Sequence, residues 1–174
     1  RLEITNRIRV STFNVRKFFD MNCDTRNCSG TYEQQPSESV FNAKAQQLAR
    51  GVETLNADII LLQELESKDC LSALASNITA DPYPVSILAE TNKAGSLDVA
   101  ILARGELVEV FSHVGVKLTL ENGQTRNFAR DLQEVHLSIG DRPVIVFNAH
   151  FVSKRTDEDG IWRRAEADAA RKII

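Results

Sequence analysis

The sequence predicts an α/β protein in which two β-sheets pack together and helices cover their outer faces. Strand and helix patterns alternate over the first half of the chain, strand patterns fill most of the second half, and a helix pattern ends the chain. The 174 residues, 43% of them hydrophobic and 26% charged, have the length and composition of about one globular domain.

The first half begins with a strand over residues 8–15, where β-branched and aromatic residues alternate roughly with others. Residues 20–38 contain few apolar side chains and predict a long loop, of a kind that often has a functional role. The stretch after this loop places apolar residues every three or four positions, as on one helix face, at Phe41, Ala45, Leu48, Val52 and Leu55. Residues 59–62 indicate a strand buried on both faces, and residues 69–78 predict a second helix.

The second half is rich in strands. Extended segments are predicted at residues 85–89, 98–103, 107–111, 114–120, 132–139 and 144–148. An Asn-Gly pair at 122–123 predicts a turn between strands. Residues 157–174 predict a helix without a C-terminal cap signal. Because the chain also starts at Arg1 and not at Met, we expect it to be part of a longer gene product.

Hydropathy and charge exclude some classes of function. No apolar run reaches the length of about 18 residues that a membrane-spanning helix needs. The net charge of −3 and the pI near 5.7 lack the basic signature of proteins that hold nucleic acid by bulk charge. An enzyme that must release its product can still act on nucleic acid through a local basic patch and metal ions.

The three cysteines leave two interpretations open. Cys23 and Cys28 flank a short polar loop, whereas Cys70 stands alone. This spacing fits neither a thioredoxin motif nor a structural zinc site, which needs a second pair of ligands. Either all three residues are free thiols, or Cys23 and Cys28 form a disulfide in an exported protein.

Four polar side chains stand at the ends of predicted strands, where a rigid backbone meets solvent. They are Asn14, Glu64, Arg130 and His150. Each has an ordinary explanation, as a turn-forming asparagine, a solvated glutamate, a surface arginine or a core histidine. Their shared placement favours a common site instead.

Phosphodiester hydrolysis is the chemistry that these side chains fit. Glu64 would bind Mg²⁺, which prefers carboxylate and water oxygens and polarises a phosphoryl oxygen. Arg130 can hold two phosphate oxygens in a fork geometry. His150 has an ordinary pKa of about 6.5, which suits phosphate polarisation or proton transfer near neutral pH. Asp98, at the start of a strand, is a candidate to orient the histidine ring, or else only a turn residue.

Five segments in chain order resemble the endonuclease/exonuclease/phosphatase superfamily, especially deoxyribonuclease I-like enzymes and bacterial secreted nucleases. They are TFNVRKFF at 12–19, ADIILLQELES at 57–67, LDVAILAR at 97–104, FARDLQEVHLS at 128–138 and VIVFNAHF at 144–151. The resemblance implies a four-layered α/β sandwich and metal-dependent cleavage of phosphoesters, with Mg²⁺ as the metal, or Mn²⁺ or Ca²⁺ in its place.

The resemblance also implies roles for the site residues. Glu64 matches the metal-binding glutamate, and Asn14 matches the asparagine beside the metal and the phosphate. Arg16 and Arg130 match phosphate-contacting arginines, and His150 matches the first catalytic histidine.

Three features stand apart from these matches. Asp98 lies near the acidic residue that pairs with the histidine in the family. Glu66 occupies the position of an arginine that reaches into the minor groove in deoxyribonuclease I, so we expect it to repel phosphates. The family's later G-D-x-N motif and Asp-His pair are not in the sequence. We therefore expect residues 1–174 to be the N-terminal part of one such domain, with little turnover alone.

Three hypotheses of function follow. The leading one is a Mg²⁺-dependent nuclease with nucleic acid as its substrate. The second keeps the fold but takes phosphoinositides or sphingomyelin as the substrate, and the third is a catalytically silent interaction domain. The Cys23–Cys28 loop and the likeness to secreted nucleases favour a secreted or periplasmic location, with the cytoplasm as the alternative.

Overall fold

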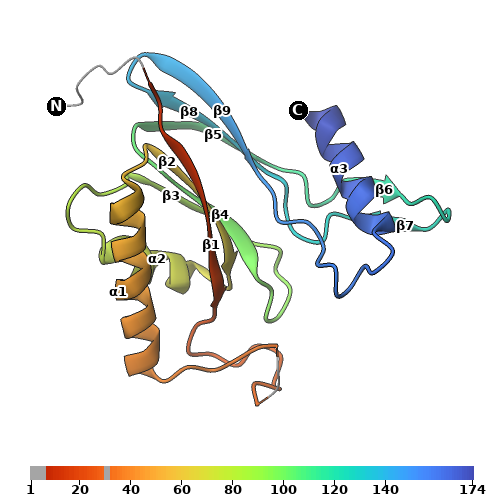
Figure 1. Ribbon diagram of the computed structural model, residues 1–174, viewed down its shortest axis with the longest axis horizontal. Coiled ribbons are helices and arrows are strands. Elements are labelled where there is room, and N and C mark those ends of the chain that lie inside the picture. Colours follow the sequence, from red (N-terminus) through yellow and green to blue (C-terminus); the bar gives the residue numbers. More distant parts are fainter. Residues whose placement is uncertain (1–6, 30–31) are drawn as a thin grey trace.

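The computed structural model describes residues 7–29 and 32–174 (Figure 1). Two sheets lie face to face, α1 and α2 flank the first sheet, and α3 lies with β6 and β7 at one end of the molecule. No helix in this part of the chain is long and apolar enough to cross a membrane. The elements are, in order, β1 (Val10–Phe18), α1 (Glu38–Leu55), β2 (Ile59–Leu65), α2 (Lys68–Ser76), β3 (Val85–Ala89), β4 (Asp98–Ala103), β5 (Glu106–Ser112), β6 (Lys117–Thr119), β7 (Thr125–Asn127), β8 (Gln133–Ile139), β9 (Arg142–Asn148) and α3 (Ile161–Ile173).

The first sheet has the strand order β1-β2-β4-β3. β1 and β2 run parallel with α1 as their crossover, and β4 lies antiparallel to both β2 and β3. All residues of β4 are buried, and most of β2 is buried too, which confirms the expectation for residues 59–62. Leu65, at the end of β2, pairs with Asp98, at the start of β4. The loops that follow β2 and precede β4 therefore leave the sheet side by side.

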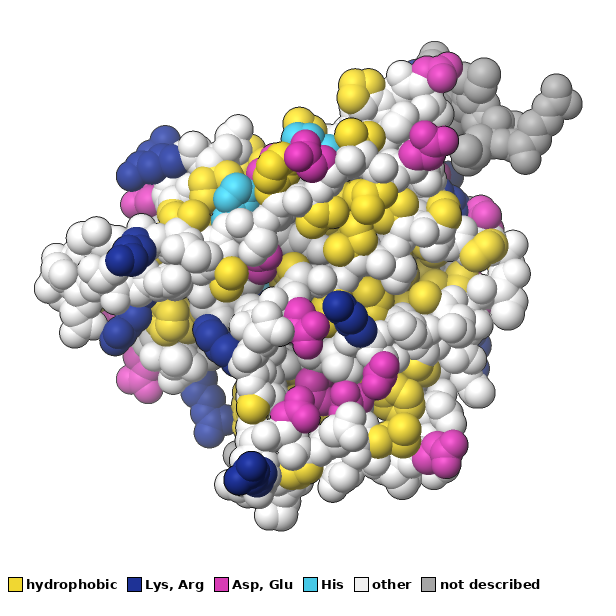
Figure 2. Space-filling view, turned by 180° about the vertical axis from the view of Figure 1, so that it is seen from behind, with side chains coloured by type: hydrophobic (Ala, Val, Ile, Leu, Met, Phe, Trp, Pro, Cys, Tyr) yellow, Lys and Arg dark blue, Asp and Glu magenta, His cyan; other side chains and the backbone are white. Residues whose placement is uncertain are grey.

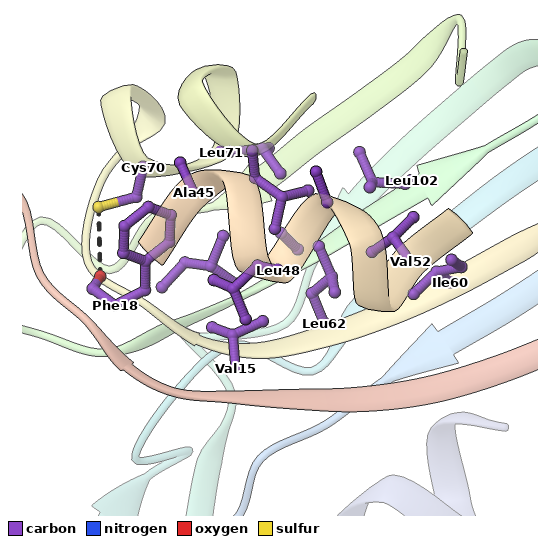
Figure 3. Close-up of a cluster of buried hydrophobic side chains, with 14 of the residues drawn as sticks. Val15, Phe18, Ala45, Leu48, Val52, Ile60, Leu62, Cys70, Leu71 and Leu102 are labelled. Atoms are coloured by element: carbon purple, nitrogen blue, oxygen red, sulfur yellow. Dashed lines mark hydrogen bonds between the residues drawn. The ribbon is translucent and has the colours of Figure 1, made fainter. Parts of the chain in front are cut away.

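Helices α1 and α2 cover one face of this sheet. The side chains of Ser37 and Ser67 cap their N-termini. The buried side of α1 packs against Phe18 and Leu62, in a cluster that also contains the thiol of Cys70, which donates a hydrogen bond to the carbonyl oxygen of Phe18 (Figure 3). Truncating a fully buried leucine such as Leu62 to alanine costs about 2–5 kcal/mol in such a core.

The second sheet has the order β5-β8-β9 and is antiparallel throughout. Its inner face packs on the face of the first sheet that the helices leave free. The side chains in this layer are apolar and include Ile59, Ile101, Val135, Leu137 and Val146. The sheets therefore form a sandwich in which residues at the strand ends come close although they are far apart in the sequence.

The second sheet also carries exposed apolar side chains, namely Leu107, Val108, Val110, Phe111 and Ile145. Beside them lies a histidine–carboxylate cluster, in which Glu134 bonds through Oε2 to His113 Nε2 at 2.8 Å and through Oε1 to His136 Nε2 at 2.6 Å. Figure 2 shows hydrophobic and histidine side chains together on the upper part of the rear face. In the described residues, helices cover only the first sheet, so three of the four expected layers are formed.

The structure confirms the α/β class and most of the expected elements. Strands 85–89 and 98–103 have the predicted bounds, and the predicted loop 20–38 holds no regular element before Glu38, apart from residues 30–31, which lie outside the described residues. The first strand is displaced, because β1 runs from Val10 to Phe18 and not over residues 8–15.

Four predictions about elements need correction. The strand expected at 114–120 shrinks to β6 because the N–H of Val116 bonds to the carbonyl of His113 in a turn. The short exposed strand β7 was not predicted. Leu55 is exposed at the end of α1. The helix expected at 157–174 begins only at Ile161, because the Asp157 carboxylate accepts the first N–H groups of α3.

Candidate active site

Glu64 stands in a β-bulge at the end of β2. The strand register shifts on both of its sides, against β1 and against β4. The backbone of Glu64 has a φ of 72°, and Arg16 and Lys17 in the neighbouring strand have φ values of 54° and 55°. Non-glycine residues in this left-handed region cost about 1–3 kcal/mol each, so the surrounding contacts must hold them there.

Hydrogen bonds fix the Glu64 carboxylate in this bulge. Asn14 Nδ2 donates to Oε1 at 2.9 Å, and the N–H of Lys17 donates to Oε2 at 2.9 Å. Asn14 Oδ1 accepts the N–H of Arg16 at 2.8 Å. Lys44, which the sequence did not single out, reaches from α1 and donates to the carbonyl oxygens of Arg16 and Lys17, each at 2.7 Å. The carboxylate is thereby aimed before any ligand arrives.

The buried side-chain amide of Asn148 links the second sheet to the strand that bears Glu64. Asn148 is 2% exposed and ends β9. Its Nδ2 donates to the carbonyl oxygens of Leu62 at 3.0 Å and Ala100 at 2.9 Å, and its Oδ1 accepts from Gln63 Nε2 at 3.0 Å. Asn148 thus ties β9 to β2 and β4, and His150 follows two residues later.

His150 faces the Glu64 carboxylate. Its Nε2 lies 3.8 Å from Glu64 Oε1, and its Nδ1 is buried without a hydrogen-bond partner in the described part of the chain. Burial lowers the pKa of His150, the positive charge of Arg130 lowers it further, and Glu64 opposes both. The imidazole is therefore neutral at neutral pH.

Arg130 is held against the same corner by backbone carbonyl groups. Its Nε donates to the carbonyl oxygen of Leu97 at 2.7 Å, and its Nη1 to those of His150 at 3.5 Å and Phe151 at 3.4 Å. The structure therefore brings Glu64, His150 and Arg130 together from three separate segments, as the sequence predicted.

Asp98 does not form the expected pair with His150. It is fully buried, and both of its oxygens are occupied: Oδ2 accepts the N–H of Thr91 at 3.0 Å and the hydroxyl of Ser96 at 2.9 Å, and Oδ1 accepts the Thr91 hydroxyl at 3.0 Å. Residues of the loop before β4 bond to both oxygens of the Asp98 carboxylate, so the carboxylate is not available to a histidine. Burial raises the pKa of Asp98 in spite of these hydrogen bonds.

The remaining two charged positions from the sequence have different surroundings. The Arg16 guanidinium is exposed beside the bulge and has no ion-pair partner among the residues described, which leaves it free to meet a phosphate. Glu66 is 4% exposed, and its Oε2 accepts the N–H of Asp20 at 2.8 Å. Burial raises the pKa of Glu66 to about 7. The expectation that Glu66 repels an incoming duplex is therefore wrong, because its carboxylate points into the protein.

Tyr32 also lies at the site, although no sequence pattern indicated it. Burial raises the pKa of its hydroxyl, while Arg130 opposes this effect through its charge and a hydrogen bond. Asp98 and Glu64 also lie close enough to act on this hydroxyl. A single tyrosine in a loop without periodicity carries no sequence signal that would place it there.

The donor set fits a hard divalent cation. Glu64 offers one carboxylate, which the amide nitrogen of Asn14 faces, while the Asn14 amide oxygen accepts the N–H of Arg16. Among the described residues, this corner contains no group of three acidic, histidine or cysteine ligands. Mg²⁺ commonly binds through one or two carboxylates and completes its shell with water and substrate phosphate oxygens, so a sparse oxygen site agrees with Mg²⁺.

Comparisons with known proteins were made for both sequence and structure. No family model matches the sequence, and no curated protein matches it significantly. Among solved structures, TDP2 from Caenorhabditis elegans matches with a TM-score of 0.52 at 22% identity, over 79% of this chain and 39% of that one. SmcL matches with a TM-score of 0.52 at 17% identity, over 96% of this chain and 59% of that one.

A third structure carries the family's own description. An endonuclease/exonuclease/phosphatase from Beutenbergia cavernae DSM 12333 matches with a TM-score of 0.50 at 18% identity, over 82% of this chain and 38% of that one. The chain thus spans only part of the length of each of these proteins. Their agreement concerns the arrangement of strands and helices. The chain therefore has the fold of solved endonuclease/exonuclease/phosphatase structures.

Proposed function

We propose that residues 1–174 are the N-terminal part of a metal-dependent phosphodiesterase domain that acts on nucleic acid. The observation that carries this proposal is the convergence of Glu64, His150 and Arg130. His150 Nε2 lies 3.8 Å from the Glu64 carboxylate, and Arg130 bonds to the His150 carbonyl. An oxygen ligand, a neutral imidazole and a fixed guanidinium are what a phosphodiester needs for binding and polarisation.

Each side chain has a distinct task in this mechanism. Glu64, whose carboxylate Asn14 orients, would hold Mg²⁺, which supplies Lewis-acid polarisation of the phosphate when bound. Arg130 binds a non-bridging phosphate oxygen through the guanidinium N–H groups that the backbone carbonyls leave free. Arg16 contacts the phosphate from the exposed side. Because His150 Nδ1 has no acceptor, we place the ring proton on Nε2, where the N–H would donate a hydrogen bond to a phosphoryl oxygen and keep its proton.

Nucleic acid is favoured as the substrate over a lipid phosphoester. The exposed guanidinium of Arg16, beside the Glu64 bulge, gives the site a second cation in addition to Arg130. Glu66, the one position that argued against a duplex, is turned inward. Arg16, Arg130 and the metal would bind the phosphate groups of the nucleic acid locally. The net charge of −3 would favour release of the cleaved nucleic acid.

Metal binding gives the first test. Titration calorimetry with Mg²⁺ should show binding to the wild-type chain and at least about tenfold weaker binding to the Glu64→Gln variant. Glu106→Gln removes a carboxylate at the exposed start of β5 and is the matched control. Equal Mg²⁺ affinity of the wild type and Glu64→Gln would refute the assignment of the metal site.

Substrate turnover gives the second test. A longer chain that contains these residues should cleave plasmid DNA or RNA with Mg²⁺ and lose this activity on His150→Ala substitution. Cleavage of a phosphoinositide or sphingomyelin headgroup ester without cleavage of nucleic acid would support the lipid alternative. Mg²⁺ binding without turnover of any of these esters would support a silent interaction domain.

We also propose a secreted or periplasmic location. Its support is the Cys23–Cys28 disulfide, which persists in oxidising compartments. Mass spectrometry of the protein from its source, alkylated before and after reduction, should show that two of the three cysteines become reactive only after reduction. Alkylation of Cys23 and Cys28 without reductant would contradict this proposal.

A further inference from the structure

A pocket of about 260 Å³ opens beside Arg130. Its walls come from four separate segments, represented by Tyr32, Ser96, Arg130 and Trp162. Arg130 is common to this pocket and to the phosphate corner, because the guanidinium that lines the pocket also bonds to the His150 carbonyl. A group covalently attached to a phosphate at Arg130 would therefore lie within reach of the pocket.

The charge of the pocket is unlike that of the whole chain. Two cationic residues, Lys93 and Arg130, line it, and none of its lining residues is acidic. The protein as a whole has a net charge of −3, and the nearest carboxylates, those of Glu33, Glu64 and Asp98, lie behind the lining, close to Gly95 and the Tyr32 hydroxyl. A carboxylate-free pocket next to the phosphate corner suits an anionic ligand and disfavours a quaternary ammonium such as choline.

Tyr32 is presented to the pocket by a braced loop. The neighbouring residue, Glu33, is 1% exposed, and its carboxylate accepts the N–H groups of Asp24 at 2.7 Å and Thr25 at 3.0 Å. The ring of Phe19 contacts the Tyr32 ring edge-on at 6.1 Å between centroids. The Cys23–Cys28 disulfide closes the same loop. The Lys17 ammonium lies over one face of the Tyr32 ring, 5.7 Å from its centroid, and Tyr32 is 49% exposed, so a stacking ligand would use the other face.

Trp162, a second aromatic residue of the lining, is fixed by hydrogen bonds. Its indole Nε1 donates to the carbonyl oxygen of Asn127 at 2.9 Å, and its backbone N–H donates to Asp157 at 3.0 Å. The guanidinium of Arg126 lies 5.9 Å from the indole centroid. Neither aromatic side chain of the pocket needs to reorganise on binding, which reduces the entropy lost when a ligand enters.

We propose that this pocket binds the planar base of the nucleotide whose phosphate is held at Arg130, with Tyr32 as the principal stacking partner. The inference rests on the proposed function and adds the base as a recognised part of the substrate. Aromatic side chains and arginine planes together make a stacking platform that accepts different bases. Such a pocket gives affinity for a nucleotide without strict selection of sequence.

The single tryptophan makes the pocket directly observable. Trp162 is the chain's only Trp, and because it also lines a second pocket beside Arg155, the Tyr32 variants below are needed to assign a fluorescence change to this pocket. We would titrate the whole chain, with Mg²⁺ present, with thymidine 5′-monophosphate, with base-free deoxyribose 5-phosphate and with phosphocholine. The nucleotide should bind about tenfold more tightly than the sugar phosphate, because the sugar phosphate lacks the stacking base.

Variants of Tyr32 separate stacking from folding. Tyr32→Ala should remove the tenfold preference for the nucleotide, whereas Tyr32→Phe, which keeps the ring, should retain most of it. Tyr83→Phe is the matched control, since the Tyr83 hydroxyl bonds to the Ala57 carbonyl in the core of the first sheet. Circular dichroism of each variant verifies that the fold is intact.

The outcomes distinguish this inference from the proposed function. Equal affinity of the wild type for the nucleotide and for the sugar phosphate would overturn the base pocket and leave the phosphodiesterase proposal standing. An unchanged preference in a folded Tyr32→Ala variant would overturn the role of Tyr32. If neither the nucleotide nor the sugar phosphate binds, the result counts against the phosphodiesterase site itself. If phosphocholine binds more tightly than the nucleotide, the nucleotide is overturned as the ligand.

Discussion

Replacing Asn148 with alanine should damage the junction between the two sheets. The amide makes three hydrogen bonds, two as donor to the carbonyl oxygens of Leu62 and Ala100 and one as acceptor from Gln63. Alanine removes all of them and leaves buried carbonyl oxygens that water cannot reach, since Asn148 is only 2% exposed. The end of β9 then loses its attachment to β2 and β4.

The size of the effect follows from these contacts. Each lost hydrogen bond costs about 0.5–1.5 kcal/mol net, so three of them amount to about 3 kcal/mol of unfolding free energy. For a chain of this length, each 1 kcal/mol lowers the melting temperature by about 2–4 °C. Asn148→Ala should therefore melt about 6–12 °C below the wild type in a thermal scan followed by circular dichroism, with a matching shift of the urea midpoint.

Two further variants make this test specific. Asn42→Ala changes an exposed asparagine on α1 and should not lower the melting temperature, because alanine is the better helix former. Asn148→Asp should be worse than alanine at pH 7, where it buries a charge that cannot donate, and should recover in acid as the carboxyl is protonated. A loss below about 1 kcal/mol for Asn148→Ala would refute the idea that this amide joins the sheets.

Reducing the Cys23–Cys28 disulfide should lower the unfolding free energy by about 2 kcal/mol, as closure of so short a loop predicts, and equal urea midpoints with and without dithiothreitol would contradict this. Gly105→Ala should cost more than Gly123→Ala in urea unfolding. Both have positive φ, but a Cβ at Gly105 would lie 2.4 Å from a backbone oxygen, whereas one at Gly123 meets nothing within 4 Å; equal losses would contradict the clash. Hydrogen bonds from His136 and His113 hold the pKa of Glu134 below its ordinary value of 4.5. Glu134→Gln should therefore be less stable than the wild type above that pH, and the difference in unfolding free energy should disappear as the pH falls through the lowered pKa. A difference that does not change with pH would contradict this linkage.

The sequence predicted those features that depend on local patterns. The uninterrupted apolar residues of β2 and β4 have no stable place except between two packed layers, so both strands were predictable. The same reasoning predicted that Glu64 and His150 would stand at strand ends, and the fold brings them together. Their chemical roles remain predictions, because they depend on a metal and a phosphate.

Other features depend on contacts between distant segments and could not be predicted. Asp98 was expected to serve His150, but the turn before β4 occupies its carboxylate. Tyr32 reaches Arg130 only because a buried glutamate and a disulfide brace the loop, and neither contact has a periodicity that a sequence displays. The role of Asn148 as a connector was hidden for the same reason, since its three partners lie 48 to 86 residues away.

The left-handed backbone at Arg16, Lys17 and Glu64 has a consequence for attempts to engineer this protein. Glycine accepts that conformation without strain, so a directed-evolution screen scored on heat resistance alone would tend to select glycine at these positions. Such winners would be sturdier proteins without the carboxylate at position 64. A useful library would keep these codons fixed and look for added robustness elsewhere.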